Sequence, residues 1–216
     1  LSCLALVIGG ATFYFASAGN PSELASLPRR YLFGDECDKW GAWTGKEAAP
    51  FSLAKQRMDT YPNGKILLSS TPILETGMMN SEFLDGDRRR YYVPCPHCNH
   101  PQWLRFEQLR WDKGQPDTAA YLCESCDTAI PEHHKSWMLE HGEWRAMMEG
   151  SGKTAGFHLS SLYSPVGWRS WRDIAAAWEA AVSKESGSAA AIKTFKNTEL
   201  GETWVEEGEA PDWQRL

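Results

Sequence analysis

The sequence lacks any apolar segment long enough to cross a bilayer, which takes about 20 consecutive residues. It also has no initiator methionine, no basic N-terminal region and no internal repeat. The first apolar run, residues 4–8, is interrupted by Gly9-Gly10, which argues against a signal peptide although Ala16-Ser17-Ala18 resembles a cleavage site. We therefore expect a cytoplasmic protein without a membrane partner. The abrupt start suggests a fragment of a longer chain.

An excess of positive charge is also missing, because the formal net charge of the 216 residues is -6. This excludes a chain coated with basic residues for nucleic acid. One local basic run remains, Arg88-Arg89-Arg90, which either contacts DNA phosphates or forms a solvated loop. With 42% hydrophobic and 23% charged residues, the composition is that of a globular rather than a disordered protein.

Cysteine is scarce outside two closely spaced pairs. Of the six cysteines, four form Cys95-x-x-Cys98 and Cys123-x-x-Cys126. Two such turns can bring four thiolates to one tetrahedral Zn²⁺ ion, each at about 2.3 Å. A disulfide framework suits a small secreted chain, whereas this chain has enough apolar residues for a core. We expect structural zinc, with an iron site, a redox pair or a disulfide as alternatives.

The stretch between the pairs, residues 99–122, is slightly longer than usual, so we expect a β excursion through Trp103 and Trp111. A complete sulfur shell leaves no open position for catalysis, and His97 and His100 then lie outside it. Contact between this module and DNA stays open, with these residues available: Arg88 to Arg90, Arg105 and Arg110.

Short apolar runs and helical segments alternate along the N-terminal part, which predicts an α/β protein. Strands are expected at 12–16, 31–33 and 65–70, and a helix over 53–60 capped by Ser52. The order strand, helix, strand favours a parallel sheet.

Later segments favour helices. One is expected over 132–140, another begins at a capping box of Ser170 and Asp173, and a third carries Ile192 and Phe195 inward. The buried face of the second is expected to carry Trp171, Ile174, Ala175, Trp178 and Val182.

Two acidic residues follow the apolar run 31–33, at Asp35 and Glu36. The tip of a buried strand faces the cleft where ligands bind in open α/β sheets. There Asp35 could hold magnesium and Glu36 could activate water as a general base. Acids at the end of a strand are also common without such a role.

Hydroxyl residues end the next predicted strand, at Ser69-Ser70-Thr71. They could sense a phosphate or its attacking water, or they could simply satisfy the backbone of the turn.

Taken together, these segments resemble the GpA-type family of phage terminase large subunits. Residues 31–38 (YLFGDECD) are similar to Walker B, with Cys37 where Val is more usual, and 67–72 (LLSSTP) to the coupling motif. The resemblance runs in order from about residue 9 to 207 and includes these further segments: 9–24, 91–98, 121–123, 156–165 and 195–204.

The resemblance implies a partial P-loop (ASCE-type) parallel sheet with an inserted four-cysteine β zinc ribbon and C-terminal helices. It implies a partial ATPase core over 1–90, the zinc ribbon over 91–131, completion of the ATPase domain over 132–207, and a linker over 208–216. Ser70 and Thr71 become coupling or nucleotide-sensing residues. ATP and magnesium are the implied cofactors beside zinc.

The resemblance also implies partners and a place of action. These are double-stranded DNA, a small terminase subunit, a portal protein and further copies of the chain on a procapsid, in the cytoplasm of a bacterial host. The reactions implied are ATP-driven packaging of viral DNA and endonuclease cleavage.

The sequence departs from the family in lacking a G-x-x-x-x-G-K-[ST] loop. We expect this Walker A loop in a missing N-terminal half and the nuclease domain beyond residue 216. The 216 residues alone should therefore neither hydrolyse ATP efficiently nor cut DNA. The alternatives are a stand-alone zinc-ribbon module that binds nucleic acid or protein, and an inactive prophage remnant.

Overall fold

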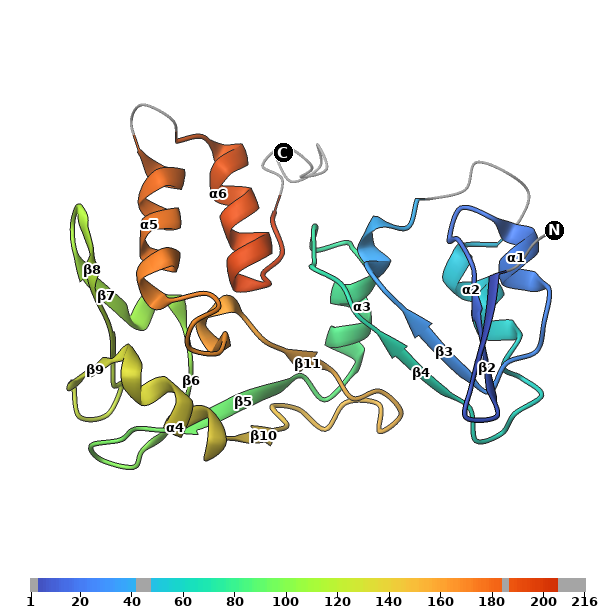
Figure 1. Cartoon of the computed structure of the whole chain (residues 1–216), viewed down its shortest axis with the longest axis horizontal. Helices are drawn as coiled ribbons and strands as arrows, with labels where there is room; N and C mark the ends of the chain where they lie inside the picture. Colours follow the sequence, from blue (N-terminus) through green and yellow to red (C-terminus); the bar gives the residue numbers. More distant parts are fainter. Residues whose placement is uncertain (1–3, 42–47, 184–186, 206–216) are drawn as a thin grey trace, which may run out of the picture. The chain divides into compact units, whose positions relative to one another are not determined.

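A computed structural model gives the fold of residues 4–41, 48–183 and 187–205 (Figure 1). The chain divides into two compact units, Leu1–Ser70 and Thr71–Leu216. Cys3 and the linker expected over 208–216 lie outside the described residues. No helix in the described part is long and apolar enough to span a bilayer.

The first unit begins with an antiparallel hairpin of β1 (Leu4–Ile8) and β2 (Ala11–Phe15). Gly9 and Gly10 both have positive φ (58° and 83°), which a two-residue hairpin turn requires and glycine adopts freely. The strand expected at 12–16 is thus confirmed. Its partner β1 is the apolar run weighed as a signal peptide, and every residue of both strands is exposed.

A parallel pair forms the rest of this unit. β3 (Tyr31–Gly34) pairs with β4 (Lys65–Leu68), in register from Tyr31 opposite Lys65 to Gly34 opposite Leu68. The short helix α1 (Pro21–Ala25) precedes β3, and α2 (Pro50–Gln56) lies between the two strands in the sequence. Strand, helix and parallel strand are therefore as expected. The described part of this sheet has two strands, so the structure does not show the P-loop parallel sheet that was expected.

The start of α2 differs from the expectation. The helix begins at Pro50 with Ala49 as its N-cap, three residues before the predicted start, and Ser52 lies inside it instead of capping it. Proline fits the first turn of a helix because the N–H that it lacks has no intrahelical partner there.

The second unit holds two small sheets. In the first, β5 (Arg89–Pro94) pairs with three strands: antiparallel with β10 (Glu143–Arg145) and β6 (Pro101–Trp103), and parallel with β11 (Phe157–His158). The second sheet is an antiparallel meander of three strands: β7 (Leu109–Asp112), β8 (Gln115–Leu122) and β9 (Ala129–Pro131). The β excursion expected between the cysteine pairs is confirmed.

The described part of this unit also holds the α-helices α3 (Met78–Asp85), α4 (Lys135–Glu140), α5 (Trp171–Val182) and α6 (Ala189–Phe195). The capping box is confirmed, since Ser170 Oγ accepts from Asp173 N (3.0 Å) and Asp173 Oδ2 accepts from Ser170 N (3.1 Å). Val182 was expected on the buried face but is 44% exposed, because the helix ends there; Ala181 is buried instead.

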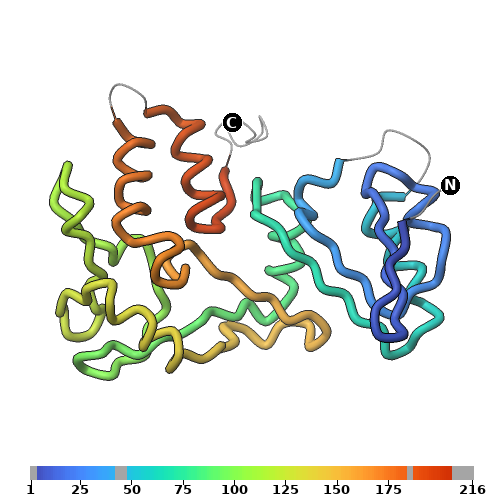
Figure 2. Tube along the Cα trace, in the orientation of Figure 1, coloured from blue at the N-terminus to red at the C-terminus, as the bar shows by residue number. Residues whose placement is uncertain are grey.

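One hydrophobic core joins the cysteine module to α5 and α6, whose course Figure 2 follows in orange and red. Trp171 is fully buried and its indole N–H donates to Leu162 O at 3.0 Å. Lys135 is also fully buried, with its ammonium on Glu132 (2.5 Å) and over the Trp171 ring (5.3 Å). A buried cation is tolerated when it is paired in this way.

Candidate functional site

The tips of β3 and β4 are joined through side chains. Ser69 Oγ donates to Asp35 Oδ1 at 2.9 Å, and the same oxygen accepts from Glu36 N at 3.0 Å. Ser70 Oγ accepts from Asp38 N at 3.1 Å. Of the two acids expected at the strand tip, Asp35 therefore contacts a hydroxyl of the residues that follow β4, which ends at Leu68, two residues before the predicted end. Thr71 begins the second unit.

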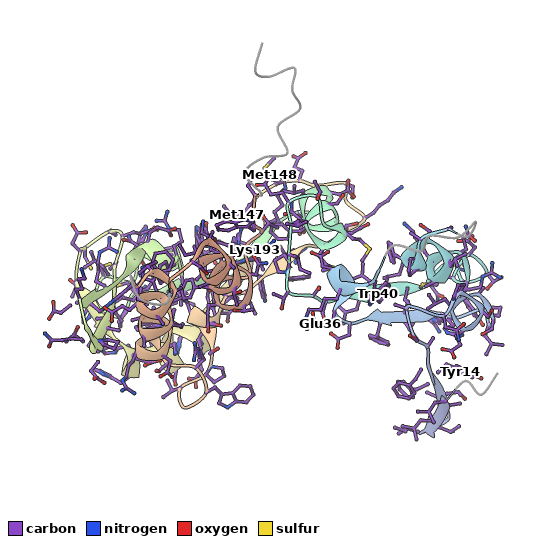
Figure 3. All side chains as sticks on the ribbon, turned by 90° about the horizontal axis from the view of Figure 1, so that it is seen from above. Tyr14, Glu36, Trp40, Met147, Met148 and Lys193 are labelled. Atoms are coloured by element: carbon purple, nitrogen blue, oxygen red, sulfur yellow. The ribbon has the colours of Figure 1, made fainter. Side chains whose placement is uncertain are left out.

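The backbone at Glu36 is in the left-handed region, with φ 50° and ψ 43°. This conformation costs a residue other than glycine about 1–3 kcal/mol and persists only where neighbours enforce it. The Trp40 indole N–H donates to Asp35 O (2.9 Å) and Lys39 Nζ lies 3.1 Å from Glu36 Oε2. Figure 3 labels Glu36 and Trp40 in this turn.

Gly34 and Cys37 pack closely against each other in this turn. A Cβ at Gly34 would lie 2.8 Å from Cys37 Sγ and 2.9 Å from Leu68 Cδ2, so only glycine fits. Cys37 is 2% exposed, and burial raises the pKa of its thiol to about 11. It is therefore a neutral apolar side chain, which suits a position where the resembling family usually has Val.

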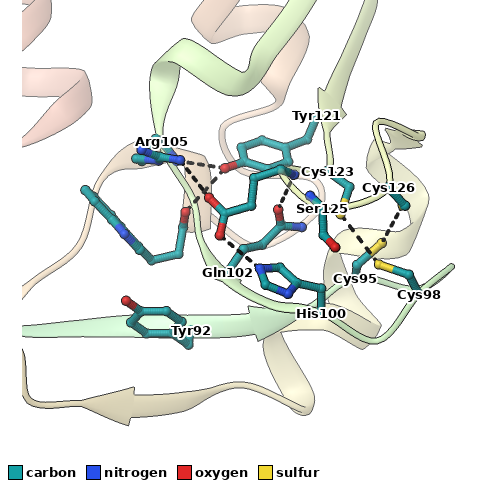
Figure 4. A network of polar contacts seen from close by, with 12 residues as sticks. Tyr92, Cys95, Cys98, His100, Gln102, Arg105, Tyr121, Cys123, Ser125 and Cys126 are labelled. Atoms are coloured by element: carbon teal, nitrogen blue, oxygen red, sulfur yellow. Dashed lines mark hydrogen bonds and ion pairs between the residues drawn. The ribbon is translucent and has the colours of Figure 1, made fainter.

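The four expected metal ligands lie together. The sulfur atoms of Cys95, Cys98, Cys123 and Cys126 are all within 4.8 Å of one another. Two of the separations are 3.9 Å, between Cys95 and Cys126, and 3.7 Å, between Cys98 and Cys123 (Figure 4). A tetrahedron with metal–sulfur bonds of about 2.3 Å has sulfur separations near 3.8 Å. All four cysteines are free in this structure, so no disulfide joins them here.

The two C-x-x-C turns have the same backbone design. Asn99 N donates to Cys95 O (2.9 Å) and Asp127 N donates to Cys123 O (3.1 Å). The residues after the second cysteines, Asn99 and Asp127, have φ values of 60° and 53°. Asn and Asp adopt this left-handed conformation more readily than most residues do. Each turn thus presents two sulfur atoms to one point.

A polar network fixes the two turns to each other. Glu124, inside the second turn, contacts His100 Nε2 at 3.1 Å and Arg105 at 2.6 Å, and its N–H donates to Gln102 Oε1 at 3.0 Å (Figure 4). His100 therefore supports the site from outside the sulfur cluster. His97 is exposed, with its ring 5.6 Å from that of His134.

The surroundings shift the pKa values of these thiols in opposite directions. Burial raises the pKa of the Cys95 thiol to about 12 and also raises the pKa of Cys123, whereas hydrogen bonds with Thr128 lower the pKa of Cys126 to about 6. At the two buried cysteines the protein alone therefore opposes the thiolates that a metal needs. A divalent cation reverses this because it stabilises the deprotonated form directly.

The arginine run is held inside the second unit. Arg88 donates to Leu84 O (2.7 Å), and Arg89 pairs with Asp87 (2.7 Å). Arg90 lies over the Trp103 ring at 4.8 Å. None of the three is a freely solvated side chain, and each guanidinium already has a partner in this fold.

A loop with the composition of a phosphate-binding loop lies at 150–154, Gly-Ser-Gly-Lys-Thr. Position 147, where the first glycine of a Walker A loop would stand, is Met147. The loop lies between β10 and β11, with no helix after it. A Walker A loop needs a helix N-terminus behind its backbone N–H groups, so this loop does not supply one.

A family model described as "Phage terminase large subunit gpA, ATPase domain" matches residues 6–144, more than half of the chain. The chain belongs to this terminase family. A second model, "Terminase large subunit gpA, endonuclease domain", matches residues 154–216 of the terminase chain. This match begins inside the stretch 132–207 that was expected to complete the ATPase domain, and it lies before the place where a nuclease was expected.

Two relatives support the same membership. The terminase chain is 30% identical over 207 residues to the terminase large subunit of Enterobacteria phage P21, and 28% identical over 197 residues to that of Escherichia phage lambda. The alignments cover 84% and 77% of the chain but 31% and 29% of the relatives. The chain thus spans about a third of their length. No solved structure matches it.

The hydroxyl run 69–71 was expected at this place, and the resemblance selected Ser70 and Thr71 from it, whereas Trp40 was missed from the sequence. Ser69, one position earlier in the same hydroxyl run, is the one that contacts Asp35. Trp40, which binds the Asp35 carbonyl, follows no motif; its only sequence signal is a large aromatic close behind the acids.

Proposed function

We propose that this chain is part of a large terminase subunit that packages viral double-stranded DNA into procapsids by ATP hydrolysis and, as a whole protein, cuts that DNA. The observation that carries the proposal is the bond between Asp35 and Ser69 at the tips of a parallel strand pair, in a chain of the GpA family.

The acids take different roles in this proposal. Asp35 Oδ1 already accepts two hydrogen bonds, so its other oxygen is the one available to a magnesium ion or its water. Bound Mg²⁺ would neutralise charge that develops on the phosphates. Glu36 would accept a proton from the attacking water, and its left-handed backbone sets the direction of its side chain. Ser70 and Thr71 remain the proposed coupling residues.

The exposed faces of the strand pair support a larger sheet. Parallel strands are normally covered on both faces, yet Phe33 is 68% and Leu67 is 60% exposed. We infer that β3 and β4 belong to a P-loop (ASCE-type) sheet, and that the phosphate loop for ATP comes from another part of the full-length protein. Residues 1–90 then form a partial ATPase core.

We further propose that zinc occupies the four-cysteine cluster and that residues 91–131 form a zinc ribbon. The sulfur separations and the paired turns support it. A full sulfur shell makes the ion structural. An iron ion in the same shell is the alternative that metal analysis would reveal.

The proposed partners are a small terminase subunit, a portal protein and other copies of the chain, in the cytoplasm of a bacterial host. Arg88, Arg89 and Arg90 stay possible DNA contacts. The side chain of Arg89 is 38% exposed and would have to exchange Asp87 for a phosphate.

The test is a packaging assay with the full-length protein that contains this chain. Wild-type protein should protect DNA inside procapsids from nuclease in the presence of ATP, and Glu36→Gln should protect none. Asp59→Asn, which changes an exposed acid of the same unit, is the matched control and should package normally. Normal packaging by Glu36→Gln would contradict the proposal. A wild-type protein that packages no DNA would also contradict it and would support the alternative of an inactive remnant.

A further inference from the structure

The beginning of the endonuclease-matched region shares one core with the cysteine module. Cys95 and Cys123 belong to the same buried cluster as residues from both matched regions. From the ATPase match it contains Val93, Leu104, Leu109, Tyr121, Ile130 and Met138; from the endonuclease match, Leu162, Tyr163, Trp171, Ile174, Ala175 and Phe195. Two of the proposed metal ligands are therefore part of the core in which these endonuclease-matched residues pack.

Tyr163 attaches this segment to the first sheet of the unit. Its hydroxyl accepts from Leu104 N at 2.7 Å and donates to Tyr91 O at 2.7 Å. β11 adds parallel pairing with β5, and Arg89 N donates to Gly156 O at 2.7 Å. One buried hydroxyl thus satisfies two backbone groups, so its removal leaves both without that partner.

Helix α5 attaches the segment to the second sheet. The Trp171 ring lies 5.8 Å from the ring of Tyr121 in β8. Glu179 Oε1 accepts from Trp111 Nε1 (3.0 Å) and from Gly114 N (2.6 Å) in the β7–β8 hairpin. Figure 1 shows α5 beside this hairpin. The segment therefore spans both sheets.

The cysteines join the same two sheets. Cys95 and Cys98 lie in the turn between β5 and β6, and Cys123 and Cys126 in the turn between β8 and β9. Among the described strands, no ladder connects the two sheets. Side chains do join them: Tyr121 in β8 donates to Trp103 O in β6 at 3.3 Å, and Glu124 N donates to Gln102 Oε1 at 3.0 Å. A metal ion held by all four sulfur atoms would add a further direct link between the sheet that Tyr163 contacts and the sheet that Trp171 contacts.

We propose that the metal site holds the start of the endonuclease-matched region in its packed position on the ATPase-matched region. Together with these side-chain contacts, zinc holds the two sheets at one separation, and α5, α6 and the segment around Tyr163 pack on the surface that this separation creates. The inference rests on the proposed zinc site and does not depend on ATP hydrolysis. If zinc stabilises the packing of this segment, the packed segment must strengthen zinc binding by the same factor.

The first test compares hydrogen exchange of the 216-residue chain with and without zinc. Removal of zinc should speed exchange over 171–182 and 189–200 by about tenfold or more, within the usual range of coupling between sites. Exchange over 31–34 and 65–68, in the other unit, should stay unchanged. Unchanged exchange over 171–182 overturns the proposal, and so does a chain that binds no zinc; neither result affects the ATPase proposal.

Loss of zinc could unfold the whole second unit, so a second test keeps the metal in place. Tyr163→Phe removes the hydroxyl that bonds to Leu104 N and Tyr91 O. The release of zinc to a chelating dye should then become about tenfold faster. Tyr92→Phe is the matched control, because its hydroxyl only meets Met147 Sδ at 3.5 Å. The proposal would be overturned if the Tyr163→Phe variant released zinc as slowly as the wild type while hydrogen exchange in α5 became faster.

Discussion

Ser69 donates a hydrogen bond of 2.9 Å to Asp35 and so ties the tip of β4 to the acidic tip of β3. These residues are 34 positions apart and meet because the two strands run parallel and in register. A shift in β4 must therefore move the carboxylate of Asp35. In a motor, this bond would pass movement between the nucleotide site and the chain after β4.

Ser69→Ala should lower ATP hydrolysis by the full-length protein about tenfold, because an oriented hydrogen bond to a charged group is worth about 1.5–3 kcal/mol. More magnesium should be needed for half-maximal activity, since Asp35 would no longer be held. Steady-state ATPase measurements across magnesium concentrations check this. Ser52→Ala, on the exposed side of α2, should leave both values unchanged. Equal values for the two variants would count against the role of Ser69.

Gly34→Ala should destabilise the first unit by about 1–3 kcal/mol, because its Cβ would press on Cys37 Sγ and Leu68 Cδ2. Hydrogen exchange over 31–34 in the 216-residue chain measures the change. Gly41→Ala is the control, since a Cβ there meets nothing within 4 Å. Similar exchange in both variants would show that the turn is not closely packed.

The purified 216-residue chain should contain one zinc ion. Cys95→Ser and Cys123→Ser should each lose it and lower the melting temperature by roughly 10 °C or more, because structural zinc contributes about 10–16 kcal/mol of binding free energy to folding. Cys37→Ser should keep its zinc. Metal analysis and thermal unfolding test this. Unaltered zinc content and melting in the Cys95 and Cys123 variants would rule out a structural metal.

Acid should weaken the second unit through His158. Burial, followed by the nearby charge of Arg90, lowers the pKa of His158 to about 4, and its Nε2 lies 3.0 Å from Gly201 O. An unfolded histidine has a pKa of about 6.5. Between these values only the unfolded chain gains a proton, so stability is full above pH 6.5 and falls as the pH drops toward 4.

The size of this loss is about 2–3 kcal/mol for one histidine. Urea unfolding at pH 7 and at pH 4.5 should show a smaller pH-dependent loss for His158→Gln than for the wild type. His141→Gln, an exposed histidine, should behave like the wild type. Equal losses for all three proteins would show that His158 does not titrate in this way.

Local chemistry made part of the fold predictable. An apolar run that ends in acids gave the tip of β3, the C-x-x-C spacing gave the sulfur cluster, and Ser170 with Asp173 gave the start of α5. Each of these depends on residues a few positions apart, or on a ligand geometry that fixes its own spacing.

Contacts between distant segments were not predictable. Nothing in the sequence near Tyr163 indicates that its hydroxyl would join Leu104 to Tyr91, or that β11 would pair with β5. The left-handed backbone at Glu36 is likewise enforced by Trp40 and the neighbouring strand, and glutamate itself does not favour it. The endonuclease match from residue 154 begins in the loop before β11, and residues on both sides of that point contribute to one core, so composition marks no boundary there.

The most direct test of the account is the rate of ATP hydrolysis by the full-length protein and its Glu36→Gln variant, each with ATP binding measured alongside. Removal of a general base should lower the rate at least about a hundredfold and leave ATP binding intact. A variant that binds ATP and hydrolyses it at the wild-type rate would contradict the assignment of the β3 tip as the catalytic site.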